Sequence, residues 1–281
     1  MSRKKILITG CSSGIGLDAA TTLQKRGWNV LATCKQEKDC RALRNMGLTS
    51  FQLDLSCSKS IDNAIKIVED ICDGKLDALF NNGAFAIPGA IEDLPREALR
   101  KIFEVNVFGQ FEVLSKCLPF IRANNGGRVI TCSSVLGFTG LPFRGAYVGT
   151  KFALEGMIDC LRRESIDSDI KYILIEPGPI DTKIRYNSQK YYEKWIQKKN
   201  SHYNQIYTNV LEDRLYKKEH KSLFELQPAS VTKRIIKALE AKKPKLRYYV
   251  TAPTFFSAVM KRLLSDKTQD LILKYRPNNF S

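Results

Sequence analysis

A tyrosine and a lysine stand four positions apart in the stretch "YVGTK", residues 147–151. Residues 146–165 have the periodicity of a helix, in which positions i and i+4 share one face, so Tyr147 and Lys151 can bring their polar ends together. A free tyrosine has a pKa of about 10, and a neighbouring ammonium favours the phenolate. We therefore expect Lys151 to lower the pKa of Tyr147 and make it an acid–base group. An isolated pair of this kind is usually just exposed on a helix, so its meaning depends on what precedes it.

Two serines precede this pair, at the end of an apolar run that we predict to be a strand (128–132). Ser133 and Ser134 would then lie at the carboxyl edge of a parallel sheet, where open α/β folds bind their ligands. A hydroxyl group at that edge can polarise a carbonyl group.

These side chains need a scaffold, and the sequence alternates short aliphatic runs with helix-period stretches. The runs predicted to be buried strands are 5–9, 29–33, 50–54, 77–81, 128–132 and 171–176. The helix-period stretches between them include 15–26, 58–71, 96–122 and 146–165. This alternation predicts a doubly wound α/β fold, a Rossmann fold with one parallel sheet covered on both faces, in a single domain over residues 1–281.

The sequence changes character after residue 182. Residues 183–227 are polar and rich in Lys and Tyr, and we predict an inserted, partly helical substrate lid there. We expect a helix at 228–241, a strand at 246–250, and a C-terminal extension over 251–281 whose portion 254–274 is amphipathic. The aromatic residues of the lid could line an apolar pocket or simply pack within the lid: Tyr186, Tyr191, Tyr192, Trp195, Tyr203 and Tyr207.

The net charge of +16 is concentrated in the last third of the chain. Residues 1–182 hold 23 Lys and Arg against 21 Asp and Glu, whereas residues 183–281 hold 22 against 8, which gives +2 and +14. Such an excess favours acidic partners, namely phosphorylated cofactors, anionic lipid or nucleic acid, although a solvated surface is commoner. No nucleic-acid-binding motif is present, and we expect no such partner. In the extension, one helical face holds Phe256, Val259, Met260 and Leu263. This face could pack on the domain, contact a second subunit, or lie weakly on an anionic membrane.

Eight cysteines are scattered without a CxxC pair or a nearby histidine cluster, so we expect neither a disulfide framework nor a metal site. The apolar runs are too short for a transmembrane helix, which needs about 20 residues. We expect a cytoplasmic protein.

A glycine-rich turn, "TGCSSGIG" (9–16), follows the first strand. Gly10 would permit a tight exit from the strand, Gly14 a close approach of a pyrophosphate, and Gly16 close helix–strand packing. The N-terminus of the following helix supplies N–H donors and a positive dipole end. This turn predicts dinucleotide binding.

The end of the second predicted strand bears on which dinucleotide is bound. Cys34 stands where NAD-binding folds place an acidic residue, and Lys35 follows it. A 2′-phosphate would meet Lys35, with help from Ser12 or Ser13, so we expect NADP(H). The alternative is that Lys35 is solvated and that Glu37 or Asp39 reaches the ribose.

The order of these motifs resembles the short-chain dehydrogenase/reductase family over residues 5–182. The resemblance rests on "TGCSSGIG", "LDL" (53–55), "NNGA" (81–84), "NVFG" (106–109), the serines before "YVGTK", and "EPGPIDT" (176–182). Within the family the chain looks most like the branch of bacterial NADP-dependent aldehyde reductases, 17-beta-hydroxysteroid dehydrogenases and retinol dehydrogenases.

The resemblance implies catalytic roles for four residues. Ser134 would hold the substrate oxygen, and Tyr147 would donate a proton to it. Lys151 would bind the nicotinamide ribose as well as tune the tyrosine. Asn106 would hold a water of the proton relay, or else be an ordinary polar residue of its helix.

The resemblance also implies a cofactor site. Asp54 and Leu55 would border the adenine, Asn82 would lie along its ribose, and Thr182 with the backbone of Ile180 would hold the carboxamide. Asp54 could instead be a turn former, and Thr182 a helix cap. The remaining residues implied at the cofactor are Gly10, Ser12, Ser13, Gly14, Ile15, Gly16, Lys35, Gly83, Tyr147, Lys151, Pro177 and Gly178.

One motif departs from the family pattern. The usual order after the fourth strand is Asn-Asn-Ala-Gly, but here Gly83 precedes Ala84. If Ala84 needed a left-handed backbone, it would cost about 1–2 kcal/mol and disturb the cofactor site.

The sequence therefore predicts an NADP(H)-dependent enzyme, a homo-oligomeric dimer or tetramer, that reduces apolar aldehydes or ketones without a metal. A steroid or retinoid dehydrogenase of the same family is an alternative. A nonenzymatic NADP-binding regulator is another alternative. Such a regulator is expected to lack one or more of the catalytic residues, whereas all four are present here.

Overall fold

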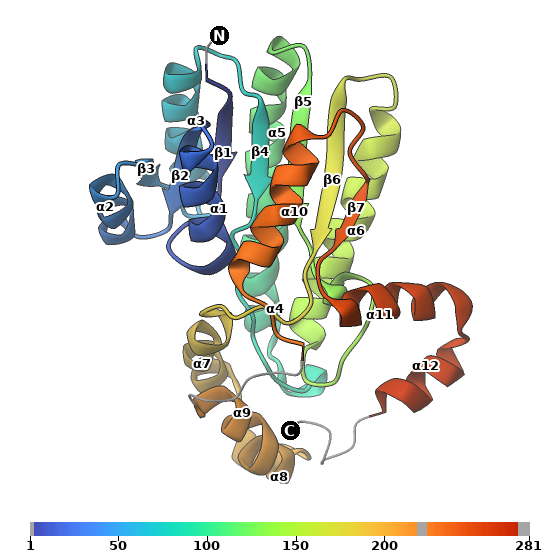
Figure 1. The fold of residues 1–281 in the computed structure, drawn as a ribbon. Coiled ribbons are helices and arrows are strands. Elements are labelled where there is room, and N and C mark those ends of the chain that lie inside the picture. The colour runs from blue at the N-terminus through green and yellow to red at the C-terminus, as the bar shows by residue number, and fades with distance from the viewer. Residues whose placement is uncertain (1–2, 218–223, 275–281) are drawn as a thin grey trace.

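Seven parallel strands form one sheet at the centre of the protein (Figure 1). The computed structural model describes residues 3–217 and 224–274, and within them the strand order is β3-β2-β1-β4-β5-β6-β7. The strands are β1 (Lys5–Ile8), β2 (Asn29–Cys34), β3 (Thr49–Gln52), β4 (Ala78–Asn81), β5 (Gly127–Cys132), β6 (Ile170–Glu176) and β7 (Arg247–Tyr249). The order reverses between β1 and β4, so this is the predicted doubly wound fold, with its ligand edge at the carboxyl ends of the strands.

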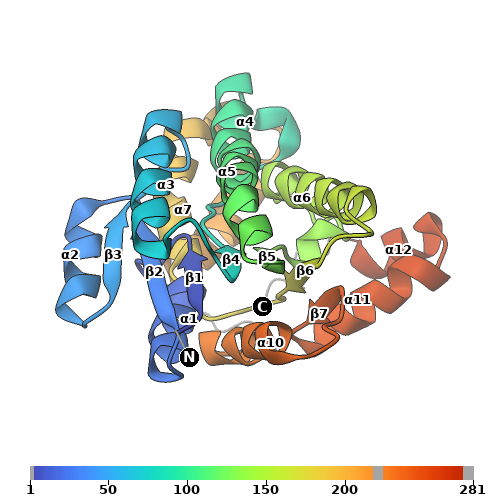
Figure 2. The same ribbon diagram turned by 90° about the horizontal axis from the view of Figure 1, so that it is seen from above.

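Helices cover both faces of the sheet, which explains why its strands are apolar on both sides. They are α1 (Gly14–Lys25), α2 (Glu37–Asn45), α3 (Ser58–Cys72), α5 (Gly109–Ala123), α6 (Gly145–Glu164) and α10 (Pro228–Glu240), while α4 (Arg96–Phe103) packs against the lid. Seen along the sheet, α3, α5 and α6 lie on one face, and α1 and α10 on the other (Figure 2).

Two apolar layers fix these helices to the sheet. On one face, Leu23 of α1 and Ile235 of α10 are fully buried with Ile6 and Ile8. On the other face, Ile61, Ala64 and Val68 of α3 pack with other buried apolar side chains, at the spacing that one helix face requires. Each large apolar side chain buried in this way contributes about 1.5–3 kcal/mol, so the layers set the positions of the loops at the sheet edge.

The predicted helix over 96–122 is interrupted. After α4, residues Glu104–Phe108 form a π-helical segment, and α5 begins at Gly109. Apolar periodicity alone does not detect one extra residue in a helix, which explains the difference. Asn106 lies in this segment.

The segment after residue 182 is helical and lies beyond the carboxyl ends of the strands (Figure 1). Its elements are α7 (Ile184–Trp195), a 3-10 turn (Lys198–Asn200), α8 (Asn204–Ile206), a π-helical segment (Tyr207–Leu211) and α9 (Glu212–Tyr216). Positions 218–223 of the predicted lid lie outside the described residues.

The amphipathic portion 254–274 is two helices instead of one. α11 (Ala252–Leu263) and α12 (Asp266–Leu273) are separated at Leu264 and Ser265, and the Ser265 side chain caps α12 by accepting from the backbone N–H of Thr268. The remaining positions of the extension, 275–281, lie outside the described residues.

The apolar face of α11 points to solvent. Phe256 is 64% exposed and Leu263 76% exposed, so the described part of the domain does not cover this face. Within residues 3–217 and 224–274, no helix combines the length and the apolar character needed to cross a bilayer.

Candidate active site

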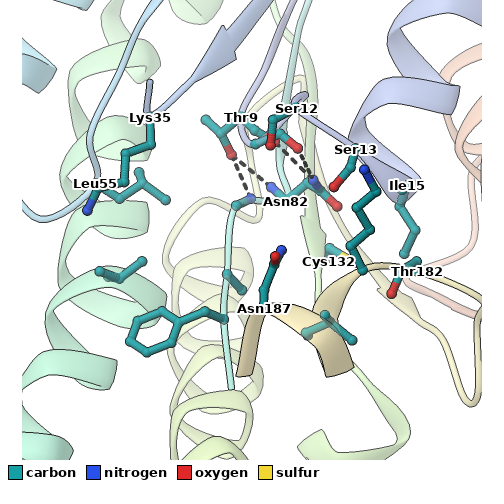
Figure 3. Close-up of a pocket in the computed structure, with 18 of the residues that line it drawn as sticks. Thr9, Ser12, Ser13, Ile15, Lys35, Leu55, Asn82, Cys132, Thr182 and Asn187 are labelled. Atoms are coloured by element: carbon teal, nitrogen blue, oxygen red, sulfur yellow. Dashed lines mark hydrogen bonds between the residues drawn. The ribbon is translucent and has the colours of Figure 1, made fainter. Parts of the chain in front are cut away.

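A cavity of about 260 Å³ opens at the carboxyl edge of the sheet (Figure 3). It brings together most of the residues predicted to bind a cofactor. The predicted residues that line it are Gly10, Ser12, Ser13, Gly14, Ile15, Lys35, Asp54, Leu55, Asn82, Gly83, Tyr147, Lys151 and Thr182. Gly16, Asn106, Ser134, Pro177, Gly178 and Ile180 are not among the lining residues.

The glycine turn between β1 and α1 forms one wall of the cavity. Gly10 and Gly14 have φ of +72° and +59°, which only glycine adopts without strain. A Cβ on Gly16 would lie 2.3 Å from the Gly10 carbonyl oxygen, so only glycine lets α1 start this close to the strand. Ser13 is the N-cap of α1, but its side chain does not accept a hydrogen bond from the first backbone N–H groups of this helix. This wall fits an anionic group such as the pyrophosphate of a dinucleotide.

Asn82 ties the glycine turn to β4. Its Nδ2 donates to the carbonyls of Thr9 and Gly10 at 3.0 and 3.2 Å, and its backbone N–H donates to Thr9 Oγ1 at 2.9 Å (Figure 3). The amide donors of Asn82 are therefore used within the protein, where they fix the shape of the turn.

The Gly83–Ala84 order carries no backbone strain. Among described non-glycine residues, positive φ occurs at Asp73, Asn125, Phe143 and Phe224, and Ala84 is not one of them. The glycine at 83 serves a close contact instead, because a Cβ there would lie 2.9 Å from Leu55 Cδ1. The departure from the family order thus leaves the local geometry intact.

Lys35 lies at the end of the cavity nearest β2. Its ammonium pairs with Asp54 Oδ2 at 3.1 Å, and its side chain remains 52% exposed. Burial opposes ionisation of Asp54, but hydrogen bonds from Ser56 and Lys35 outweigh it and lower the pKa of this carboxyl. Neither Glu37 nor Asp39 lines the cavity, and Glu37 instead pairs with Arg44.

Tyr147 and Lys151 lie at the other end, next to the ends of β5 and β6, and Ser134 lies beside Tyr147 just outside the lining. The Ser134 side chain faces Tyr147 closely enough to oppose the rise in the pKa of its phenol. Lys151 is 1% exposed, and its Nζ donates to the Cys132 carbonyl at 2.7 Å. Ser134 Oγ also lies 3.5 Å from the Pro177 carbonyl, and it accepts from the Leu136 N–H at 3.1 Å.

The expected lowering of the tyrosine pKa does not hold in this arrangement. Burial raises the pKa of the Tyr147 phenol above its usual range, Cys132 adds to the rise, and the Ser134 side chain opposes it. Lys151 Nζ lies 5.5 Å from the centre of the Tyr147 ring and bonds to Cys132, so its charge faces the ring and the strand end. Burial in turn lowers the pKa of Lys151, against the effects of Cys132 and Glu155.

Asn106 is fully buried and joins two parts of the site. Its Nδ2 donates to the Phe85 carbonyl at 2.8 Å and to Thr150 Oγ1 at 3.2 Å, and its Oδ1 accepts from the Phe85 N–H at 3.0 Å. Thr150 Oγ1 donates in turn to the Tyr147 carbonyl at 2.8 Å. The side chain of Asn106 thus connects the loop after β4 to the helix that carries Tyr147.

Apart from Thr182 and Lys183, the loop after β6 supports the cavity and does not line it. The Val135 N–H donates to the Pro177 carbonyl at 2.8 Å, and Ile180 pairs with Leu226. A Cβ on Gly178 would lie 2.1 Å from Thr251 Oγ1, so this glycine lets the loop pass close to the start of α11.

Helix α7 closes the cavity. Of the lid aromatics proposed as possible pocket lining, Tyr191 does line it, and Asn187, which sequence reasoning did not name, lines it as well. Asn187 and Tyr191, one turn apart on α7, both line it, and the Tyr191 ring stacks on Phe85 with centres 4.3 Å apart. Their spacing of four in a helical segment was an available signal. Most other lid aromatics pack within the lid: Tyr192 and Tyr207 are 4% and 0% exposed, whereas Tyr186 is 70% exposed. The remaining lining residues missed by sequence reasoning are Thr9, Leu53, Ala84, Phe85, Val105, Cys132, Lys183 and Ile184.

Two curated proteins are similar to this chain over most of its length. The uncharacterised oxidoreductase YbbO of Escherichia coli K12 is 36% identical over 273 residues, which cover 97% of this chain and 94% of that protein. Human 17-beta-hydroxysteroid dehydrogenase type 1 is 32% identical over 264 residues, which cover 89% of this chain and 78% of that protein.

Solved structures share the fold. A short-chain dehydrogenase of Burkholderia cenocepacia in complex with NADP has a TM-score of 0.75 at 20% identity, covering 98% of this chain and 99% of that one. A homologue from Burkholderia phymatum in complex with NAD has the same TM-score and identity, covering 98% of this chain and 96% of that one.

Residues 4–193 match the family model for short chain dehydrogenases. With the reversed parallel sheet and the glycine-walled cavity, this match shows that the chain belongs to the short-chain dehydrogenase family of nicotinamide-dependent oxidoreductases.

Proposed function

We propose that the protein reduces an aldehyde or ketone to an alcohol with NADPH. The observation that carries this proposal is the placement of Tyr147 and Lys151 at one end of the cavity, with Ser134 beside Tyr147 just outside the lining, and of the glycine turn and Lys35 at the other end. The first group suits work on a carbonyl oxygen, and the second suits a phosphorylated dinucleotide.

The chain's own groups would hold the cofactor along the cavity. The N-terminus of α1 would bind the pyrophosphate, and Asp54 and Leu55 would border the adenine. Tyr147, Lys151 and Thr182 would lie at the nicotinamide end. When bound, NADPH supplies the hydride.

Ser134 would donate a hydrogen bond to the substrate oxygen, and Tyr147 would give it a proton. Tyr147 is a protonated phenol at neutral pH, as a proton donor must be, although its raised pKa makes it a weaker acid than a free tyrosine. The nearby charge of Lys151 would stabilise the phenolate that remains after proton transfer. Asn106 would keep this helix and the loop after β4 in register, in addition to any part in a water relay.

The preference for NADPH over NADH rests on Lys35. This is the cation at the β2 end of the cavity lining, and half of its side chain is accessible to a 2′-phosphate despite the pair with Asp54. The related structures include one complex with NADP and one with NAD, so the family fold accommodates both.

A steroid or retinoid alcohol is the second candidate substrate class. It is favoured by the similarity to 17-beta-hydroxysteroid dehydrogenase type 1 and by the stacked Phe85 and Tyr191, which offer an apolar, aromatic surface in the cavity. A panel of aliphatic aldehydes, steroids and retinoids, each with NADPH and with NADH, would separate the two classes.

We also propose that the exposed apolar face of α11 contacts an anionic membrane surface. Phe256 and Leu263 project from a helix that also carries Lys261 and Arg262, a combination that suits acidic headgroups over an acyl layer. Such a contact would suit an apolar substrate. A second copy of the chain is the competing occupant.

The central test is Tyr147→Phe. It removes the proposed proton donor and should lower kcat for carbonyl reduction by about 100- to 10,000-fold. NADPH binding, followed by quenching of cofactor fluorescence, should change little. Tyr186→Phe makes the same chemical change at an exposed position that does not line the cavity and should leave turnover unchanged. Near-normal turnover by Tyr147→Phe would refute the assignment.

A further inference from the structure

Two buried carboxyl groups share one arginine behind the active site. Glu176, at the end of β6, is fully buried, and Glu155, on α6, is 7% exposed. Nη1 of Arg247, on β7, donates to Glu176 Oε1 at 2.6 Å and also to Glu155 Oε2. Because both carboxyl groups bond to the same nitrogen, they lie next to each other.

The charges of this cluster do not balance if both glutamates are ionised. Two buried carboxylates would then face one guanidinium and leave a net negative charge away from water, which is costly. Asp159 also contacts Arg247, at 3.0 Å, but it is 29% exposed and pairs with Arg162 as well. A single proton on the glutamate pair would make the buried part neutral.

The oxygens that face away from Arg247 support the same conclusion. Glu155 Oε1 and Glu176 Oε2 are buried, and no described residue donates to them, except that the Ser133 hydroxyl lies beside Glu155 and opposes the rise in its pKa. A carboxylate leaves such acceptors unsatisfied at high cost, whereas a carboxylic acid can donate to a neighbouring carboxylate. This is the arrangement by which two adjacent carboxyl groups hold one proton.

Other titratable groups around the pair are few. α6 contributes Lys151, one turn before Glu155, and β7 contributes Tyr249, while Arg262 of α11 lies near Tyr249. Burial raises the pKa of Glu176 to about 8, the neighbouring Glu155 adds to the rise, and Arg247 opposes it without reversing it. Burial also raises the pKa of Glu155.

The pair is built into the turn that carries Ser134. The Ser133 N–H donates to the Ile175 carbonyl and the Val135 N–H to the Pro177 carbonyl, each at 2.8 Å, so Glu176 lies between the two residues that hold the turn. On the other side, a Cβ on Gly137 would lie 2.5 Å from Ser133 Oγ and 2.9 Å from Glu155 Oε1. Only glycine lets the turn pack this closely on Glu155.

We propose that Glu155 and Glu176 share one proton and, with Arg247, form a positioning unit that holds the Ser134 turn against α6 and β7. None of the three lines the cavity, so they act through the turn and not on the substrate. The effect on catalysis rests on the proposed function, but the shared proton does not.

The shared proton has a signature in stability. The ordinary pKa of a glutamate is 4.5, so between that value and about 8 the folded protein binds a proton that the unfolded chain has released. The unfolding equilibrium constant should therefore rise with pH in this window, by about tenfold per pH unit at most for this group. The stabilisation from this proton is complete below the pKa of the glutamate in the unfolded chain. It is lost as the pH rises through the pKa of the glutamate in the folded protein.

The test compares the wild-type protein with Glu176→Gln in urea unfolding at a series of pH values. The glutamine keeps the size and a hydrogen bond to Arg247 but cannot ionise. Between pH 5 and pH 8, the unfolding equilibrium constant of the wild type should therefore rise by about tenfold or more relative to that of the variant. Asp159→Asn, at the exposed contact of the same arginine, should keep the pH dependence of the wild type. Parallel curves for the wild type and Glu176→Gln would overturn the proposal.

Infrared spectroscopy tests the proton even if the variant fails to fold. The folded wild type should show the C=O stretch of a protonated carboxyl at about pH 6.5 and lose it at about pH 9, above the folded pKa. Absence of that band at the lower pH would overturn the shared proton. For the positioning role, kcat of Glu176→Gln should vary less with pH than wild-type kcat while NADPH affinity is unchanged. Lack of any carbonyl reduction by the wild type would count against the proposed function alone.

Discussion

Replacing Asn106 with alanine should destabilise the protein as well as slow it. The change removes the acceptor of the Phe85 N–H and the donor to the Phe85 carbonyl, at 3.0 and 2.8 Å, and one bond to Thr150. A fully buried polar group left without a partner costs about 1–3 kcal/mol, and the two Phe85 backbone groups are only partly buried, so together they predict a loss of about 1–3 kcal/mol in the free energy of unfolding. A role confined to holding a catalytic water would predict almost no loss.

Urea unfolding followed by circular dichroism measures this directly. With an m-value of about 3 kcal/mol/M, the midpoint should fall by about 0.3–1 M. Asn63→Ala, at an exposed position of α3, should stay within about 0.5 kcal/mol of the wild type. Thr150→Val removes one bond of the set and provides a milder variant that should still be measurably destabilised. A midpoint for Asn106→Ala equal to that of the wild type would refute this reasoning.

Two further predictions concern the cofactor and the membrane surface. A hydrogen bond to a charged group is worth about 1.5–3 kcal/mol. Lys35→Glu should therefore weaken NADPH binding by about 10- to 150-fold or more and NADH binding far less. The control Lys38→Glu, which lies outside the cavity, should weaken the binding of neither cofactor. Equal loss for both cofactors would show that Lys35 does not contact the phosphate. Replacing Phe256 and Leu263 with serine should reduce cosedimentation with phosphatidylglycerol vesicles at low salt, while Met46→Ser, which is also an exposed apolar position, should not. If the wild type does not sediment with vesicles but sedimentation velocity shows an oligomer that the double variant loses, the face joins two copies of the chain.

The fold could be predicted because its signals are local and repeated. Each strand of the sheet reads as a short apolar run, and "KILIT" or "KYILIE" needs no partner to be recognised. Boundaries differed by a residue or two, as with β1, which ends at Ile8. The helix over 96–122 was predicted as continuous because the π-helical segment at Glu104–Phe108 leaves the apolar periodicity nearly unchanged.

Much of the cavity was also predictable, because the glycine turn and the Tyr147–Lys151 pair are local motifs. Contacts between distant segments were not. The pair of Lys35 with Asp54 and the stacking of Tyr191 on Phe85 depend on how loops and the lid settle on the sheet. The Arg247 cluster joins residues that are 92 and 71 positions apart, and no spacing in the sequence marks it.

The pKa of Tyr147 could not be predicted from spacing either. Four residues along a helix place two side chains on one face, but they do not decide which atoms meet. Here the ammonium of Lys151 bonds to the Cys132 carbonyl, and burial of the phenol dominates its titration. Burial is a property of the assembled fold, not of the motif.

The π-helical segment also decides where this helix can change length. A π-helical turn takes up about one residue more than an α-helical turn. Deleting one residue between Glu104 and Phe108 should therefore restore regular winding while Val113, Cys117 and Ile121 keep facing the sheet. The same deletion inside α5, where no wide turn absorbs it, would rotate the side chains after it by about 100° and misalign that apolar surface.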